Sequence, residues 1–163
     1  MKLRISVQIS TGMAYLHEQN VVHRDLKSLN ILITDDYSAK LCDFGLSKTT
    51  SGSSLNSCIG SLNWCAPEVL LKNEPFGRSA DVFSFGMILL ELYTHTPPFS
   101  DMLPLQIVKA IDSGSLLPIP SSCPRAFSML IKRCWDYTPK NRPSFVEIEK
   151  ELSKISPTAF PRK

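Results

Sequence analysis

Two short apolar segments separated by a polar turn place several chemically distinctive residues in one small region of the chain. Residues 31–33 and 39–42 have the composition of strands, and the five residues 34–38 between them favour a turn. Such a hairpin brings Asn30, which enters the first strand, beside Asp43, which leaves the second, because paired strands run about 5 Å apart. The sequence therefore predicts that an amide oxygen and a carboxylate converge, and this donor pair suits magnesium.

An ordered series of motifs surrounds this hairpin. Asp-Phe-Gly alone would occur by chance in a chain of this length about one time in fifty. The series is more specific, because each further motif follows at a defined separation from the one before it. Its members are His23-Arg24-Asp25-Leu26-Lys27-Ser28-Leu29-Asn30, Asp43-Phe44-Gly45, Ala66-Pro67-Glu68 and the segment 81–86, Asp-Val-Phe-Ser-Phe-Gly. On these motifs the chain resembles the C-terminal lobe of eukaryotic protein kinases, from about residue 3 to residue 155.

The resemblance implies a mainly α (α+β) fold, the C-terminal lobe of the protein-kinase fold with a small β-hairpin at the active site and no N-terminal lobe. Helical periodicity agrees with this fold class. Helices are expected over residues 1–19, 79–94, 105–111, 127–135 and 144–155. In the third of these, Leu105, Val108 and Ile111 are expected to share a buried face. The lobe is expected to span 1–155, with 156–163 as a frayed tail.

The resemblance also implies a reaction, the transfer of the ATP γ-phosphoryl group to a protein hydroxyl with Mg²⁺ as the metal. Such transfer needs a carboxylate for the acceptor's proton, cations around the phosphates, and oxygen ligands for the metal. By the family pattern, Asp25 is the base and Lys27 neutralises charge on the phosphoryl group. Asn30 and Asp43 hold the metal. The same pattern assigns the ATP contacts to Lys27, Asn30, Leu32 and Asp43, with Leu32 on the adenine side.

Supporting roles follow from the same resemblance for His23, Arg24, Phe44, Gly45 and Ser61. Ser61 is expected to face Asp25 and Lys27, and Lys27 together with Ser61 resembles serine/threonine-specific kinases. The sequence around both residues resembles the tyrosine-kinase-like group, which includes Raf and mixed-lineage kinases. Strict Ser/Thr specificity and dual specificity therefore both stay open. Arg24 could pair with a phosphate on the polar segment 48–57, which has the position of the activation loop.

Three further residues are assigned structural roles by the resemblance. Asp81 is expected to accept backbone hydrogen bonds from the turn at His23 and Arg24. Glu68 and Arg142 are expected to form a buried ion pair, and removing one partner of such a pair costs about 3 to 5 kcal/mol.

The small lobe of a complete kinase has no counterpart within these 163 residues. The seven glycines never form G-x-G-x-x-G, and Lys2 has no V-A-x-K context. The chain is therefore expected to be a fragment that is inactive alone, with an N-terminal lobe or a regulatory protein as the missing partner. The alternative is a kinase-derived binding or scaffold module, similar to a pseudokinase. A third possibility is a non-kinase ATP-binding protein, but the sequence has no glycine-rich phosphate-binding loop that would support it.

Composition argues against several other functional classes. The charge of +3 comes without a dense basic run, which argues against nucleic-acid binding. The apolar helix at 79–94 is shorter than the roughly 20 residues of a membrane span, and polar residues interrupt any signal sequence near the start. Five cysteines form no C-x-x-C pair and are an odd number, which favours reduced thiols in a cytoplasmic protein.

Overall fold

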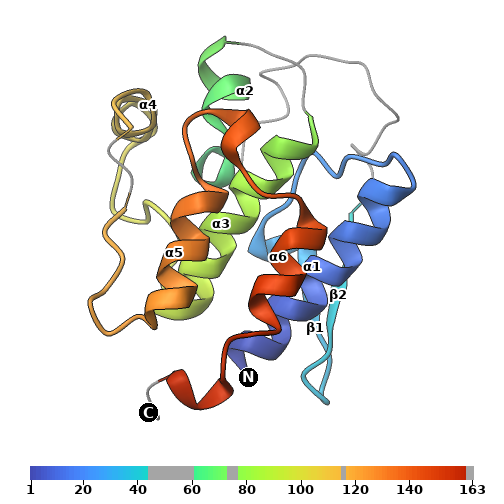
Figure 1. Ribbon diagram of the computed structural model, residues 1–163. Helices are drawn as coiled ribbons and strands as arrows, with labels where there is room; N and C mark the ends of the chain where they lie inside the picture. Colours follow the sequence, from blue (N-terminus) through green and yellow to red (C-terminus); the bar gives the residue numbers. More distant parts are fainter. Residues whose placement is uncertain (44–60, 73–76, 115–116, 161–163) are drawn as a thin grey trace.

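The computed structural model describes residues 1–43, 61–72, 77–114 and 117–160, and in these residues it is mostly helical (Figure 1). The mainly α prediction is confirmed. The α-helices are α1 (Lys2–Glu18), α2 (Pro67–Lys72), α3 (Arg78–Thr94), α4 (Pro104–Asp112), α5 (Arg125–Cys134) and α6 (Phe145–Leu152). The strands β1 (Ile31–Ile33) and β2 (Ala39–Leu41) pair antiparallel. Short 3-10 turns are η1 (Ser28–Asn30), η4 (Leu62–Trp64), η5 (Pro139–Asn141) and η6 (Pro157–Ala159).

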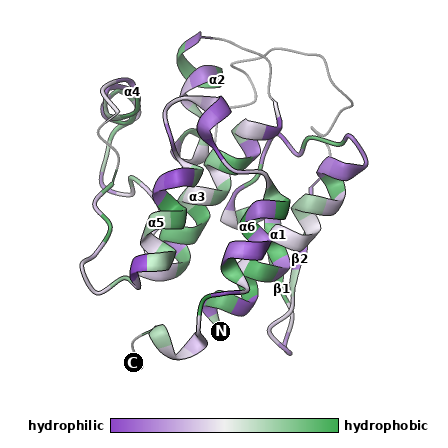
Figure 2. Ribbon diagram, viewed as in Figure 1, coloured by the Kyte–Doolittle hydropathy of each residue, from purple (hydrophilic) through white to green (hydrophobic). Residues whose placement is uncertain are grey.

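Helix α3 lies at the centre of the lobe. Its side chains are buried on nearly all sides, as the apolar stretch predicted, and most of the helix is hydrophobic in Figure 2. Helix α5 runs along one side of it and α6 and α1 along another (Figure 1). Gly86 permits the close approach of α5, because a Cβ at this position would lie only 2.9 Å from the Cβ of Cys134. This packing makes α3 the element against which the rest of the lobe is positioned.

Helix α1 supports the hairpin. Ile5, Ile9 and Met13 are buried at the helical spacing that the sequence predicted. On the side of α1 away from the core, the Gln8 side-chain oxygen accepts a hydrogen bond from the Ala39 backbone at 3.0 Å. The hairpin therefore has a fixed position relative to a core helix, although its two strands are only three residues long each.

One expectation about the periphery needs revision. In α4 Ile111 is buried as predicted and Val108 is partly buried, whereas Leu105 is exposed and Ile107 is buried in its place, so the prediction was wrong at Leu105. Leu105 lies in the first turn, just after Pro104, and the i, i+4 pair defines the packed side. At the other end of the chain, expected to be frayed, Phe160 packs edge-on against Phe127 with ring centroids 5.1 Å apart.

The cysteines also differ in part from the expectation. Cys42, Cys123 and Cys134 have free thiols. Cys65 is disulfide-bonded, which contradicts the expectation of reduced thiols at that position. Burial raises the pKa of the Cys123 thiol to about 11 and that of Cys134 further still, so these two thiols are poorly reactive at neutral pH.

Candidate active site

Three side chains predicted from the motifs meet in one hydrogen-bonded cluster, which we call the Asp25 cluster (Asp25, Lys27 and Ser61). The Ser61 hydroxyl donates to Asp25 Oδ1 at 2.5 Å, and Lys27 Nζ lies 2.7 Å from Asp25 Oδ2. Lys27 Nζ also donates to Ser61 Oγ at 2.7 Å. All three side chains are largely buried. A buried carboxylate, a cation and a hydroxyl are thus held together although 34 or more residues separate Ser61 from the other two.

Asn30 is fixed by Asp25 at the start of the hairpin. Its Nδ2 group donates to the backbone oxygen of Asp25 at 2.7 Å and to Asp25 Oδ2 at 3.0 Å. Both amide protons are directed at one residue, so the amide oxygen is the atom of Asn30 that could hold a cation. The bond to Oδ2, together with the contacts from Ser61 and Lys27, holds the Asp25 carboxylate in a single orientation.

Asp43 lies one residue further along than the hairpin argument assumed. The register pairs Ile31 with Leu41, and the Cys42 backbone donates to the Asn30 oxygen at 3.0 Å. Cys42, not Asp43, is therefore the residue opposite Asn30. Asp43 follows with a left-handed backbone at φ 62° and an exposed side chain. Amide and carboxylate oxygens are suitable magnesium ligands, and two of them leave coordination positions for phosphate oxygens and water.

The turn that carries Asp25 is anchored on α3 through Asp81. Asp81 Oδ2 accepts from the His23 backbone at 2.9 Å and Oδ1 from the Arg24 backbone at 3.0 Å. His17 Nε2 also lies 2.9 Å from Asp81 Oδ2. Arg24 has a left-handed φ of 69°, which is costly for a residue with a side chain. The bonds from Asp81 stabilise this strained turn directly before the candidate base.

Glu91 is a site residue that the motifs did not reveal. It lies near the C-terminal end of α3, where Oε1 accepts from the Ser28 hydroxyl at 2.8 Å and Oε2 from the Trp64 indole at 3.2 Å. Burial raises the pKa of the Glu91 carboxyl, and the two hydrogen bonds oppose that change. A signal was present in the sequence, since Asp81 and Glu91 are the only charged residues between positions 79 and 94.

The expected ion pair between Glu68 and Arg142 is present. Arg142 Nη1 donates to Glu68 Oε1 at 2.7 Å and Nη2 donates to Oε2 at 2.8 Å, the two-pronged geometry that arginine favours with carboxylates. Arg142 also donates to the backbone oxygens of Ser79 at 2.9 Å and Asp136 at 2.7 Å. One buried guanidinium thus joins α2, the start of α3 and the segment before α6.

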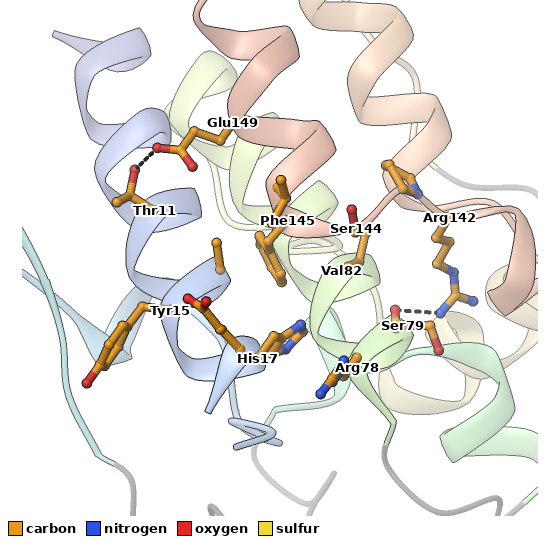
Figure 3. A pocket seen from close by; sticks show the side chains of 14 residues that line it. Thr11, Tyr15, His17, Arg78, Ser79, Val82, Arg142, Ser144, Phe145 and Glu149 are labelled. Atoms are coloured by element: carbon orange, nitrogen blue, oxygen red, sulfur yellow. Dashed lines mark hydrogen bonds between the residues drawn. The ribbon is translucent and has the colours of Figure 1, made fainter. Parts of the chain in front are cut away.

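A cavity of about 670 Å³ lies away from the Asp25 cluster, between α1, the start of α3 and α6 (Figure 3). His17 and Phe145 line it, and Thr11 donates to Glu149 at its edge at 2.6 Å. The Arg142 guanidinium reaches this cavity, but Glu68 and backbone oxygens already occupy its donors. None of the residues assigned to ATP or the metal lines it.

Some predicted residues cannot be compared with the structure. Phe44, Gly45 and the segment 48–57 lie outside the described residues. Leu32, assigned to the adenine side, is 56% exposed on β1. Within the described part of the chain, no group of three or more His, Cys, Asp or Glu side chains forms a metal site. In the same part, no helix combines the length and the apolar character that crossing a membrane requires.

Comparison with known proteins agrees with this geometry. The sequence profile of the family described as protein tyrosine and serine/threonine kinase matches residues 1–152. The chain is 47% identical over 145 residues to mitogen-activated protein kinase kinase kinase 12 of Rattus norvegicus, covering 88% of this chain and 16% of that protein. It is 44% identical over 154 residues to the serine/threonine/tyrosine-protein kinase HT1 of Arabidopsis thaliana, covering 93% of this chain and 39% of that protein.

A third relative is mitogen-activated protein kinase kinase kinase 13-B of Xenopus laevis, 45% identical over 145 residues, which are 88% of this chain and 15% of the relative. The chain therefore belongs to the protein tyrosine and serine/threonine kinase family. The resemblance inferred from the motifs is confirmed. The chain spans between 15% and 39% of the length of these three relatives.

Proposed function

We propose that residues 1–155 form the catalytic-loop lobe of a serine/threonine protein kinase, which transfers the γ-phosphoryl group of ATP to a hydroxyl of a protein substrate. The observation that carries this proposal is the Asp25 cluster, in which a carboxylate, an ammonium group and a hydroxyl are in mutual contact. Phosphoryl transfer depends on positioned charges more than on covalent chemistry by the protein. A prearranged cluster of this kind supplies such charges without reorganisation during the reaction.

The proposed roles follow from the atoms that each side chain presents. Asp25 orients the acceptor hydroxyl and accepts its proton, because its carboxylate is fixed by three donors and is ready to accept another. Lys27 places its positive charge beside the transferred group. Asn30 and Asp43 would hold Mg²⁺, which would supply positive charge to the phosphate groups of ATP. Leu32 offers an exposed apolar surface for the adenine ring.

The proposed specificity for serine and threonine as acceptor residues rests on Lys27 and Ser61. These two side chains are in contact, and the pair matches the motif pattern of serine/threonine kinases. Two of the relatives are named mitogen-activated protein kinase kinase kinases, and the third is named a serine/threonine/tyrosine-protein kinase. The proposed cytoplasmic location rests on the kinase relatives and not on the cysteines, because Cys65 is disulfide-bonded. Arg24 is available to bind a phosphate on the segment 48–57. Arg24 Nε is buried and has no hydrogen-bond partner among the described residues.

A binding module without catalysis is the competing function. One observation favours it, namely the exposed apolar residues beside the Asp25 cluster, with Leu29 73% and Ile33 47% exposed. An apolar surface of this kind is a contact site for another protein domain. In the kinase proposal that domain is an ATP-binding small lobe, whereas in the binding-module alternative it is a partner that remains bound without phosphoryl transfer.

The substitution Asp25→Asn, made in a two-lobed form that joins this lobe to an ATP-binding small lobe, tests the proposal. The amide keeps the shape but cannot accept the proton, so we expect kcat to fall about 10²- to 10⁴-fold while the melting temperature changes little. Phosphate incorporation into a generic Ser/Thr substrate is the measurement. The matched control is Asp35→Asn in the exposed β1–β2 turn, which should keep full activity. Turnover by Asp25→Asn within a few-fold of the unmodified protein would remove Asp25 from the role of base.

A further inference from the structure

Helix α3 contacts the segment 23–28 at two separate points through its only two acidic residues. Asp81 holds the backbone at His23 and Arg24, and Glu91 holds the Ser28 side chain. Asp81 and Glu91 are ten positions apart, which corresponds to about 15 Å along the helix axis. The two carboxylates therefore fix both ends of the segment that contains Asp25 and Lys27, and Asp81 alone fixes only the first end.

The second oxygen of Glu91 reaches a different part of the chain. The Trp64 indole donates to Glu91 Oε2 at 3.2 Å, and the Trp64 backbone oxygen accepts from the Ser84 hydroxyl at 2.8 Å. Ser84 and Glu91 are seven residues apart, which places them on the same face of α3. The Trp64 amide in turn donates to the Ser61 oxygen at 3.1 Å, closing the turn η4. Trp64 is thus held on α3 at two points, and Ser61 lies three residues before it.

The partly buried position of Glu91 disfavours its charged form, because burial raises the pKa of the carboxyl. The neighbouring positions on α3 are apolar, with Ile88 and Leu90 both buried. An apolar side chain at position 91 would satisfy the packing without this cost, but it could accept neither hydrogen bond. The two bonds to separate segments therefore account for a carboxylate at this position better than packing does.

We propose that Glu91 is a positioning residue of the candidate active site, which links Ser28 to Trp64 and so holds Lys27 and Ser61 in contact with Asp25. Ser28 adjoins Lys27, and Trp64 belongs to the same turn as Ser61. The Asp25 cluster joins the two segments directly, and Glu91 adds a second link from α3, through Ser28 and Trp64. The link itself does not depend on any activity, whereas its consequence for phosphoryl transfer rests on the proposed kinase function.

The link can be tested in the 163-residue chain by NMR, because the sequence has only two tryptophans and thus two indole N–H signals. The Trp64 signal is assigned with Trp64→Phe. In Glu91→Ala we expect hydrogen exchange at the Trp64 indole and at the amides of 28–30 and 61–65 to rise about tenfold or more, since a hydrogen bond to a charged group is lost at each segment. The Trp135 indole should be unaffected. The control Glu18→Ala removes an exposed carboxylate of α1 and should change neither signal.

A second NMR measurement tests whether Glu91 couples the segment at Ser28 to the segment at Trp64. A residue with a purely structural role would not transmit a change at Ser28 to the Trp64 indole. Ser28→Ala should shift the Trp64 indole resonance in the presence of Glu91, and should shift it far less in a Glu91→Gln background. Glu91→Gln keeps the side-chain length but has only one acceptor oxygen, so it can accept one of the two hydrogen bonds and not both. It therefore breaks the link and replaces Glu91→Ala if that variant does not fold. An unchanged Trp64 signal in Glu91→Gln and Ser28→Ala, or an equal rise in exchange at Trp135, would overturn the proposal.

The catalytic consequence is measured in the active two-lobed form. We expect Glu91→Gln to lower kcat about 10-fold or more while KM for ATP stays near its original value, because small misplacements of reacting groups are costly and Glu91 is assigned no ATP contact. If the unmodified two-lobed form transfers no phosphate, the proposed function fails while the NMR result on Glu91 still stands. If it is active and kcat is unaffected although the link is broken, Glu91 is not a positioning residue.

Discussion

At the residue scale, the candidate site contains backbone conformations that are unfavourable for the residues that adopt them. Arg24 and Asp43 both have positive φ, at 69° and 62°, and they lie directly before Asp25 and directly after Cys42. Such conformations persist where surrounding contacts determine them, and they concentrate at functional sites. Asp81 supplies those contacts for Arg24 through two backbone hydrogen bonds. The strain thus lies directly before the proposed base and at the proposed metal ligand itself.

A prediction at this scale concerns the buried ion pair. Glu68 is 4% and Arg142 8% exposed, so Glu68→Ala leaves an uncompensated guanidinium, and we expect the melting temperature to fall by about 10 °C. Arg142→Ala should cost more, because the backbone oxygens of Ser79 and Asp136 then lose a donor as well. The double mutant should be close to Arg142→Ala. Thermal unfolding of all three variants gives the coupling free energy.

The exposed pair between Arg133 and Glu151 is the matched control for this cycle. Its side chains are 46% and 34% exposed, and surface pairs contribute only about 0 to 1 kcal/mol. Arg133→Ala and Glu151→Ala should each shift the melting temperature slightly. Additive losses for Glu68 and Arg142 would mean that the buried pair makes no coupled contribution.

Residues within contiguous motifs could be predicted from the sequence, whereas residues that act through tertiary contacts could not. The cluster of Asp25, Lys27 and Ser61 follows from a motif pattern in which each position has an assigned role. Glu91 is distinctive in the sequence only as one of two charged residues in an apolar helix, and no role follows from that, because its partners, Ser28 and Trp64, lie 63 and 27 residues away. The hairpin register was missed by one residue, since turn composition alone does not determine which residues pair.

At the element scale, short elements are fixed by their ends and their neighbours. Helix α6 has eight residues, and Ser144 followed three residues later by Glu147 is the sequence pattern of a capping box at its start. The structure has this capping box, with the Glu147 carboxylate accepting from the Ser144 backbone at 2.7 Å. In α4, by contrast, the buried face was predicted from Leu105, and only tertiary packing selects Ile107 instead. Caps are local and can be predicted from sequence, whereas the face that a short helix buries depends on its neighbours.

The cap of α6 gives a prediction with a defined pH dependence. Ser144→Ala removes a side-chain acceptor from the first turn and should destabilise the lobe by about 1 kcal/mol at neutral pH, whereas Ser144→Thr should be nearly neutral. Hydrogen bonds from the Ser144 backbone and hydroxyl lower the pKa of the Glu147 carboxyl. The folded state therefore favours the ionised carboxylate, and this contribution is present above the pKa of the unfolded chain and lost as the pH falls through the folded value.

Chemical denaturation from pH 7 down to pH 3 measures this dependence. The destabilisation by Glu147→Gln should be largest at neutral pH and shrink towards acid, because the carboxylate that it replaces is then protonated in both states. A difference between Glu147→Gln and the unmodified chain that does not vary with pH would contradict an ionised cap.

At the scale of the whole molecule, one face of the lobe combines the candidate site with exposed apolar side chains. Leu29, Leu32 and Ile33 are 73%, 56% and 47% exposed, and they lie in η1 and β1, directly after Lys27. A cavity of about 270 Å³ adjoins them, lined by aliphatic side chains of α1, β1 and α3 such as Ile5, Ile31 and Leu92. This face has the character of a domain interface, and a second domain that covered it would also enclose the Asp25 cluster.

The last prediction is that the 163-residue chain, tested by itself, transfers no phosphate at a measurable rate. It offers Asn30 and Asp43 for a metal and Leu32 as one apolar surface for adenine, but its sequence has no G-x-G-x-x-G loop and no V-A-x-K lysine for the phosphates. Stabilisation of the transferring group depends on prearranged donors in a cleft that excludes water, and Asp43 and Leu32 are exposed. Weak or undetectable binding of Mg-ATP is therefore expected in calorimetry.

Phosphate incorporation into a generic Ser/Thr substrate completes this test, with Asp43→Ala as the control that removes the proposed metal ligand. The unmodified chain and Asp43→Ala should be equally inactive when alone, whereas only the unmodified lobe should become active when it is joined to an ATP-binding small lobe. Incorporation by the isolated chain that disappears in Asp43→Ala would contradict the prediction. In that case the donors on this lobe would suffice for catalysis, and the exposed apolar face around Leu32 would need no second domain to form the ATP site.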